Sequence, residues 1–320
     1  MNTKQQFKII SFYEFINLNE INNISKSIQE FASINKIRGT VIIASEGING
    51  SMAGIPHDID KLLEYLKLLK FNYLNIKETF CYEMPFYRLK VKIKKEIVSM
   101  LSNPINADLP RGIHLNSKEW NDLISNDETL ILDIRNTYET DIGQFNSAIV
   151  TNSNSFAEFK NFVDSQLSTI KDKKIAMYCT GGIRCEKASF YMKTLGFNDI
   201  YQLDGGILKY LEDTPNDKSQ WSGECFVFDN RVSVNKFLEK GNYELCRGCN
   251  NPISKNERFS NEYEKDVSCS HCYTKTNELK KNKFRERSKQ VDLAKEREES
   301  YIYDNLNYNQ YIEDINLDNL

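Results

Sequence analysis

The segment MYCTGGIRCEKASF, residues 177–190, places a cysteine directly after a short apolar run and before two glycines and an arginine. The glycines free the backbone to curl, so that successive N–H groups can point at one atom. The start of the helix that follows adds positive potential, and Arg184 adds a full charge. Together these features are expected to lower the thiol pKa of Cys179 and to stabilise a thiolate or an oxyanion. The pattern favours a reacting cysteine over a buried structural one.

Residues near this cysteine are candidates for supporting roles. Cys185, expected in the first helical turn, fits a resolving thiol, a redox partner or a small packed residue equally well. Lys187, like Arg184, could stabilise an oxyanion. Asp133 and Arg135 end another predicted strand at the same sheet edge; they could orient the loop or the substrate, although a structural ion pair is the favoured interpretation. The predicted active-site loop consists of Cys179, Thr180, Gly181, Gly182, Ile183 and Arg184.

Four later cysteines have the spacing of a metal site. Cys246 and Cys249 form CRGC, Cys269 and Cys272 form CSHC, and 19 residues separate the pairs. Two such knuckles are typical of tetrahedral zinc bound by four thiolates. His271 could replace a cysteine but is expected to be exposed. Because a closed four-cysteine site leaves no position for substrate, we predict structural zinc.

The charge is distributed unevenly along the chain. Residues 1–95 carry 14 Lys and Arg against 9 Asp and Glu, residues 96–215 carry 11 against 17, and residues 275–297 carry 9 against 4. Two basic regions around an acidic centre suit a polyanion held at both ends, although solvated surface charge alone would give the same counts. The candidate cations for RNA binding are Arg88, Lys90, Lys92 and Lys94 on one strand face and Lys281, Lys283 and Arg285 on a basic helix.

The elements that position these residues follow from hydrophobic periodicity. Residues 5–95 predict β-α-β-β-α-β, an α+β sandwich with the helices on one sheet face. From residue 113, short apolar runs alternate with helical patterns, which indicates a parallel sheet covered on both faces. Residues 216–297 are irregular and cysteine-rich and end in a charged helix. The tail, residues 298–320, is predicted to be disordered.

The composition is that of a protein of the cytoplasm. No apolar run approaches the length of a membrane span, and the N-terminus lacks the pattern of a secretory signal. The eight cysteines therefore suggest metal binding or catalysis in a reducing compartment rather than disulfides. No membrane association and no protein partner is predicted.

Several motifs carry a family resemblance. CTGGIRCEKAS resembles the active-site loop of rhodanese domains, and LDIRNTYETDIGQFNSA and LDGGILKY resemble other segments of that fold. SEGINGSMAG, EMPFYRLKVKIKKEIV, WSGECFVFDNRV and the CxxC pairs occur in the same order in bacterial rhodanese-domain tRNA uridine hydroxylases, and the resemblance covers about residues 7–297. It implies a ferredoxin-like domain over residues 1–100, a rhodanese-like domain over 113–215, and a zinc module with a basic helix over 216–297.

The resemblance implies oxygen-dependent hydroxylation of the wobble uridine of tRNA at C5, with the anticodon region as partner and Cys179 as the essential residue. A thiolate could add to C6 of uracil, or Cys179 could first be oxidised and carry the oxygen itself. The sequence has no flavin, haem or non-haem iron signature. The alternatives are a sulfurtransferase that carries a persulfide on Cys179, and an RNA-binding adaptor with an inert rhodanese domain. A cysteine phosphatase is disfavoured, because the segment from Cys179 to Arg184 is shorter than the phosphate cradle of those enzymes.

Overall fold

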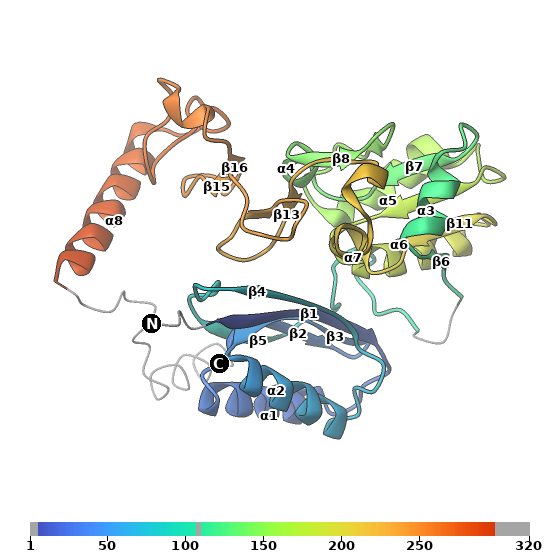
Figure 1. Ribbon diagram of the computed structural model, residues 1–320, viewed down its shortest axis with the longest axis horizontal. Coiled ribbons are helices and arrows are strands. Elements are labelled where there is room, and N and C mark those ends of the chain that lie inside the picture. Colours follow the sequence, from blue (N-terminus) through green and yellow to red (C-terminus); the bar gives the residue numbers. More distant parts are fainter. Residues whose placement is uncertain (1–5, 107–109, 298–320) are drawn as a thin grey trace. The chain divides into compact units, whose positions relative to one another are not determined.

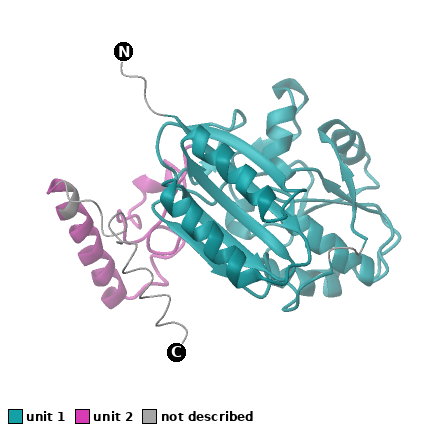
Figure 2. Ribbon diagram, turned by 90° about the horizontal axis from the view of Figure 1, so that it is seen from below, with its two compact units in different colours: residues 1–241 teal, residues 242–320 magenta. Residues whose placement is uncertain are grey.

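The computed structural model describes residues 6–106 and 110–297. It divides into two compact units, residues 1–241 and residues 242–320 (Figure 2). The first unit contains two five-stranded sheets, and the second contains the four clustered cysteines and a long helix. The predicted fold class, an α+β sheet followed by a parallel sheet and a cysteine module, is confirmed. The tail over residues 298–320 lies outside the described residues.

The first sheet follows from alternation along its strands. In its first strand Ile10 and Phe12 enter the core, whereas Ser11 and Tyr13 face the other way. The strand order is β4-β1-β3-β2-β5, with every pair antiparallel except β2–β5. The elements are β1 (Phe7–Phe15), α1 (Ile21–Ile34), β2 (Arg38–Ala44), β3 (Gly47–Gly54), α2 (Pro56–Leu68), β4 (Asn75–Cys81) and β5 (Leu89–Ile93).

Helices α1 and α2 both lie on one face of this sheet and leave its other face without a helix from these two (Figure 1). Ile28 of α1 and Leu62 and Leu66 of α2 are fully buried against the sheet. The structure has one strand more than the predicted β-α-β-β-α-β pattern, because the final predicted strand is β5 and β4 precedes it. β4 lacks an apolar run: its Ile76 and Phe80 are partly exposed at the sheet edge.

The second sheet is parallel throughout, in the order β6-β11-β10-β7-β9. All four residues of β10 are buried, since helices cover both faces and the strand has no polar side. One core layer contains Phe159 and Met192, and the other contains Trp120 and Tyr210. The elements are β6 (Ile113–Leu115), α3 (Ser117–Ile124), β7 (Leu130–Asp133), α4 (Thr137–Thr140), β9 (Ile149–Val150), η1 (Phe156–Glu158), α5 (Phe159–Phe162), η2 (Val163–Leu167), β10 (Ile175–Tyr178), α6 (Ile183–Thr194), β11 (Ile200–Leu203) and α7 (Gly206–Asp213).

Short pairs complete the two units. In the first unit, β8 (Gly143–Phe145) pairs with β12 (Trp221–Gly223), and β13 (Cys225–Phe226) pairs with β14 (Ser233–Val234). The short helix η3 (Asn216–Lys218) leads into β12. The second unit contains β15 (Glu244–Leu245), β16 (Pro252–Ile253), η4 (Glu257–Phe259) and α8 (Glu278–Glu296).

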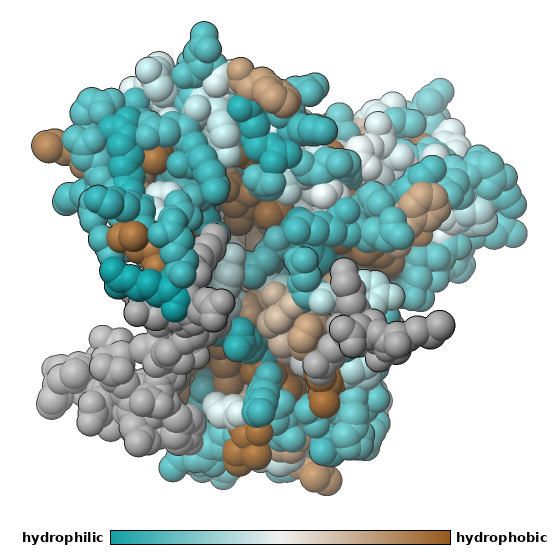
Figure 3. Space-filling view, turned by 60° about the vertical axis from the view of Figure 1, so that its left-hand side comes forward, coloured by the Kyte–Doolittle hydropathy of each residue, from teal (hydrophilic) through white to brown (hydrophobic). Residues whose placement is uncertain are grey.

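The surface is that of a chain without membrane-spanning helices in its described part. Over residues 6–106 and 110–297, no helix combines the length and the apolar character needed to cross a bilayer. The face drawn in Figure 3 is largely hydrophilic, and hydrophobic residues occupy scattered areas of it.

Candidate active site around Cys179

The cysteine loop lies between the end of β10 and the start of α6, as predicted. Gly182 has a φ of 97°, which a residue with a side chain rarely adopts, and its N–H donates to Cys179 Sγ at 3.1 Å. A Cβ at this position would lie 2.9 Å from Tyr13 Oη, so β1 of the first sheet closely approaches the loop. Glycine is required here both by the backbone conformation and by this approach.

Cys179 is fully buried, yet its surroundings favour the thiolate. Burial alone would raise the thiol pKa, but the Cys185 thiol, the Arg184 guanidinium and the backbone N–H groups of both residues outweigh it and lower the pKa of Cys179 to about 5. Burial and the neighbouring thiolate raise the pKa of Cys185 well above its usual value. At neutral pH the pair is therefore one thiolate and one thiol that donates to it.

Arg184 reaches this cysteine as part of an ion pair that the sequence analysis did not find. Its Nη1 and Nη2 donate to the two carboxylate oxygens of Glu139 at 2.6 and 2.7 Å, and Thr180 Oγ1 donates to Glu139 Oε1 at 3.1 Å. Glu139 is fully buried; burial opposes its ionisation, but Arg184 holds the pKa of the carboxyl below its usual value. The segment Asn136-x-x-Glu139 is a capping box, which signals a helix start but not burial of the glutamate.

Asp133 and Arg135 form a second buried pair behind the first. Arg135 Nε and Nη2 donate to Asp133 at 2.9 and 2.6 Å, Nη1 donates to the Glu139 carbonyl at 3.2 Å, and Nη2 donates to the Gly143 carbonyl at 2.6 Å. Neither residue lines the cavity next to Cys179. These contacts are internal ones that hold the one-turn helix α4, and with it Glu139, at the end of β7.

The first residues of α7 support the loop through backbone contacts. Gly206 has a φ of 67°, and a Cβ there would lie 2.5 Å from the Cys179 carbonyl oxygen. The N–H groups of Ile207 and Leu208, at the start of α7, donate to the carbonyls of Cys179 and Thr180 at 3.0 and 3.2 Å. The LDGGILKY segment is therefore a backbone support for the reactive loop.

Cys179 opens on a cavity of about 490 Å³ whose far wall is the uncovered face of the first sheet. The loop supplies Cys179, Thr180, Gly181 and Arg184; the sheet supplies Ser11, Tyr13, Thr40, Asn49, Ser51 and Lys77; and the segment around β13 supplies Val227, Phe228, Asp229 and Arg231. Ser11 Oγ and Ser51 Oγ lie 3.0 Å apart, within hydrogen-bonding distance. Small hydroxyl groups, set among apolar residues such as Phe12 and Ile42, thus share the cavity with Cys179.

The predicted basic strand borders the same sheet face. Lys77, Ser11, Ser51, Thr40 and Lys90 are successive register partners across all five strands. Lys92 of β5 is likewise the partner of Ile42, another cavity-lining residue. A polar row therefore runs from the cavity to the cations of β5. Arg88 and Lys94 flank that strand and are exposed.

The structure places Lys187 away from the cavity. Its Nζ lies 2.7 Å from Glu46 Oε1, 2.5 Å from Glu96 Oε2 and 2.9 Å from the Val98 carbonyl, and its side chain is fully buried. Glu46 and Glu96 come from the first sheet's domain and the segment after it, whereas Lys187 is on α6. The ammonium is thus occupied in holding α6 to that domain and does not face the cavity.

Comparison with known proteins assigns both domains. Residues 7–97 match the family described as the UPF0176 acylphosphatase-like domain, and residues 116–213 match the rhodanese-like domain. The chain joins a UPF0176 acylphosphatase-like domain to a rhodanese-like domain. The cavity lies between the rhodanese-like loop and the uncovered face of the acylphosphatase-like sheet.

Solved structures resemble each domain separately. A rhodanese-related protein from Thermoplasma volcanium is 25% identical over 32% of this chain and 95% of its own, with a TM-score of 0.27. A single-domain sulfurtransferase from Saccharomyces cerevisiae is 20% identical over 32% and 91%, with a TM-score of 0.27. An acylphosphatase from Coxiella burnetii is 18% identical over 28% and 99%, with a TM-score of 0.23.

The four cysteines after the rhodanese-like domain come together in the second unit. Their sulfur atoms all lie within 4.8 Å of one another, with Sγ–Sγ distances of 3.9 Å for Cys246–Cys272, 3.7 Å for Cys249–Cys269 and 4.0 Å for Cys269–Cys272. A tetrahedron with Zn–S bonds of about 2.3 Å has edges of about 3.8 Å. The cluster therefore has the donors and the dimensions to hold a metal ion such as zinc.

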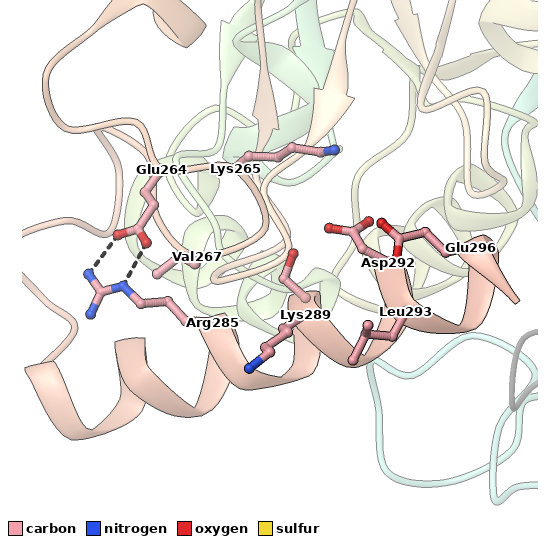
Figure 4. Close-up of a pocket in the computed structure, with 9 residues that line it drawn as sticks. Glu264, Lys265, Val267, Arg285, Lys289, Asp292, Leu293 and Glu296 are labelled. Atoms are coloured by element: carbon pink, nitrogen blue, oxygen red, sulfur yellow. Dashed lines mark hydrogen bonds and ion pairs between the residues drawn. The ribbon is translucent and has the colours of Figure 1, made fainter.

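Two of the three predicted cations of α8 make contacts within the second unit. Arg285 pairs with Glu264 at 2.6 Å (Figure 4), and Lys281 is buried with its Nζ 3.8 Å from the centroid of the Tyr273 ring. Lys283 is exposed. A shallow pocket of about 370 Å³ runs along the helix beside Arg285 and Lys289. Arg285 and Lys281 thus help to fix the helix, and Lys283 remains on the surface.

Proposed function

We propose that the chain is a tRNA-modifying enzyme that hydroxylates C5 of the wobble uridine, position 34, to give 5-hydroxyuridine, with Cys179 as the catalytic residue and dioxygen as co-substrate. The observation that carries the proposal is the cavity itself. A thiolate with a pKa of about 5 shares the cavity with the polar side chains Ser11, Thr40, Asn49 and Ser51, which lie among apolar ones, and the row through Thr40 continues in register to Lys90. A planar polar base would be held by the wall and a phosphate backbone by the cations.

Motifs outside the rhodanese-like domain support this substrate over a small thiol acceptor. SEGINGSMAG supplies Asn49, Gly50 and Ser51 to the cavity lining, and WSGECFVFDNRV supplies Val227, Phe228 and Arg231. These are the segments in which the chain resembles tRNA uridine hydroxylases. Their residues meet at the one cavity that also holds Cys179, which is the arrangement a shared substrate site requires.

The chemistry follows from the thiolate. Cys179 Sγ adds to C6 of the uracil ring, and the electron pair of the C5=C6 bond moves into an enolate with carbanion character at C5. C5 then acquires one oxygen atom of dioxygen, the C5 proton leaves, and the C6–S bond breaks. Two electrons and two protons from an external thiol reductant convert the second oxygen atom to water. C5–H is thus replaced by C5–OH, and Cys179 is restored.

A persulfide carrier is the second candidate, favoured by the rhodanese-like match and by the Gly182 N–H that donates to Cys179 Sγ. A persulfide on Cys179 would need the same cradle of donors. It would not need the polar sheet wall, which is why hydroxylation is preferred. Thiocyanate formation from thiosulfate and cyanide measures this activity directly.

The deciding experiment is nucleoside mass spectrometry of tRNA from cells that lack the gene and carry either the wild-type chain or Cys179→Ser. Return of 5-hydroxyuridine and its derivatives with wild type alone is the expected result. Equal modification with both forms would refute a catalytic role for Cys179. Loss of a thiolated nucleoside, with 5-hydroxyuridine unchanged, would favour the persulfide carrier.

A further inference from the structure

Lys77, on β4 of the acylphosphatase-like domain, lines the same cavity as Cys179 and is only 8% exposed. A Cβ built on Gly205 would lie 3.1 Å from Lys77 Cε, so the end of this side chain lies against the turn that supports the cysteine loop. Its Nζ is 5.5 Å from the centroid of the Tyr13 ring. The lysine thus extends from one domain to the turn in the other domain that supports the reactive loop.

Lys77 differs from the other buried lysines in having no anionic partner. Among the described residues, the lysines with less than a tenth of their surface exposed are Lys8, Lys77, Lys187 and Lys281. The three others each have a carboxylate oxygen within 4.0 Å, whereas the Lys77 ammonium has no ion pair or hydrogen bond in the described part of the chain. Burial without a counter-ion costs stability, so a structural role does not account for this residue.

The electrostatic state of Lys77 matches this isolation. Burial lowers the pKa of its ammonium to about 8, while the negative charges of Asp204 and Cys179 act in the opposite direction. Lys77 is therefore mostly protonated at neutral pH and close to releasing its proton. A buried cation that pairs with no carboxylate of the described residues is available to an anionic ligand in the cavity.

We propose that Lys77 is a catalytic residue: its ammonium binds the uracil O4 and stabilises the negative charge that forms there when Cys179 Sγ adds to C6. This inference rests on the proposed hydroxylation and names the group that makes its first step possible. One S–C bond forms, the C5=C6 electron pair moves toward O4, and the ammonium donates a hydrogen bond without losing its proton. Tyr13 is a positioning residue, since its ring lies beside the ammonium and its hydroxyl abuts Gly182.

The test isolates the addition step from oxygen chemistry. The full chain is incubated with tRNA that contains 5-fluorouridine, and the covalent adduct on Cys179 is quantified by intact-protein mass spectrometry. Lys77→Met is expected to slow adduct formation about 100-fold, the scale of losing one preorganised charge at an oxyanion. The matched control is Lys209→Met, which removes a charge close to Lys77 but outside the cavity, where Lys209 pairs with Glu212 and Asp213.

Two readouts exclude a folding defect. Lys77→Met should unfold at the same temperature as wild type or higher, because the substitution removes a buried cation that has no ion pair among residues 6–106 and 110–297. The rate at which iodoacetamide alkylates Cys179 should not fall, because the thiolate remains.

In wild type the rate of adduct formation should rise as the pH passes about 5, where Cys179 ionises, and decline above about 8, where Lys77 loses its proton. Lys77→Arg should remove the decline, since guanidinium stays charged.

Failure of this inference is distinct from failure of the proposed function. If Lys77→Met forms the adduct and 5-hydroxyuridine as fast as wild type, Lys77 has no catalytic role, although hydroxylation by Cys179 stands. If wild type forms no adduct but restores 5-hydroxyuridine in cells, the addition step and the role of Lys77 are both overturned. If neither adduct nor 5-hydroxyuridine depends on Cys179, the proposed function fails as well.

Discussion

At the scale of the residue, Cys179 shows that burial alone does not decide the charge of a group. Desolvation opposes the thiolate, and fixed donors outweigh it because they need no reorganisation. The Gly182 N–H, the Cys185 thiol and the Arg184 guanidinium all belong to the loop or the first turn of α6. The low pKa is therefore a property of a short segment, provided that other elements hold that segment in place.

Arg184 gives the first prediction at this scale. Arg184→Gln removes a positive charge near Cys179 and leaves Glu139 buried without its partner. We expect the thiol pKa to rise from about 5 and the free energy of unfolding to fall by about 3–5 kcal/mol. The pH dependence of iodoacetamide alkylation measures the pKa, and urea denaturation measures the stability.

A double variant separates the two effects. Arg184→Gln with Glu139→Gln removes the unpaired carboxylate, so most of the lost stability should return while the thiol pKa remains raised. An unchanged alkylation profile in the single variant would show that the backbone donors and the Cys185 thiol are sufficient to ionise Cys179. In that case Arg184 serves only to bind Glu139.

At the scale of the element, two sets of contacts hold the loop and the helix that follows it, and only one of them could be predicted from the sequence. The Gly205-Gly206 turn before α7 belongs to a recognisable motif, and its closeness to Cys179 follows from parallel strand order. The partners Glu46 and Glu96 of Lys187 did not follow from any local pattern, because they are 141 and 91 residues away along the chain. Glu139, Tyr13 and Lys77 were missed for the same reason.

Local sequence patterns therefore predicted the helices, the strands and the reactive loop, but not the residues from distant segments that pack against the loop. Periodicity predicts which side chains point away from a core, as the alternation in β1 does for Ser11 and Tyr13. It does not identify what lies opposite the uncovered face. β4 was overlooked because an edge strand with exposed apolar residues has no clear period, and Lys77 was lost with it.

The prediction at this scale concerns the ion pairs of Lys187 with Glu46 and Glu96. Lys187→Met leaves two buried carboxylates facing each other, so we expect the free energy of unfolding to fall by about 3–5 kcal/mol and α6 to lose its link to the acylphosphatase-like domain. Hydrogen exchange should increase in α6 and in residues 100–102, whose N–H groups donate to the Glu96 carboxylate. Lys193→Met is the matched control near the end of the same helix, where the half-buried Lys193 donates to the Asn198 carbonyl and has no ion pair in the described part of the chain. Equal hydrogen exchange in Lys187→Met and Lys193→Met would show that Lys187 does not hold α6 to the acylphosphatase-like domain.

At the scale of the whole molecule, the Cys179 cavity and the four clustered cysteines belong to separate compact units. Every residue of the Cys179 cavity comes from residues 1–241, and all four clustered cysteines come from residues 242–320. The second unit has a small core made largely of the cysteines themselves with Ile253 and Tyr263. A hydrophobic core of that size is too small to stabilise a fold by itself, so we expect a bound metal ion to stabilise this unit.

The last prediction follows from that division. The purified chain should contain about one zinc ion, and Cys246→Ser or a strong chelator should remove it. Because the second unit then loses its main source of cohesion, a protease should cleave within residues 242–297 while residues 1–241 stay intact. Alkylation of Cys179 should keep its wild-type pH profile, since no residue of that site is a ligand. Cys81→Ser, which changes a cysteine outside the cluster, is the control and should retain the zinc. A second unit that resists the protease equally with and without metal would show that its packing is sufficient and that the four thiols are not a structural zinc site.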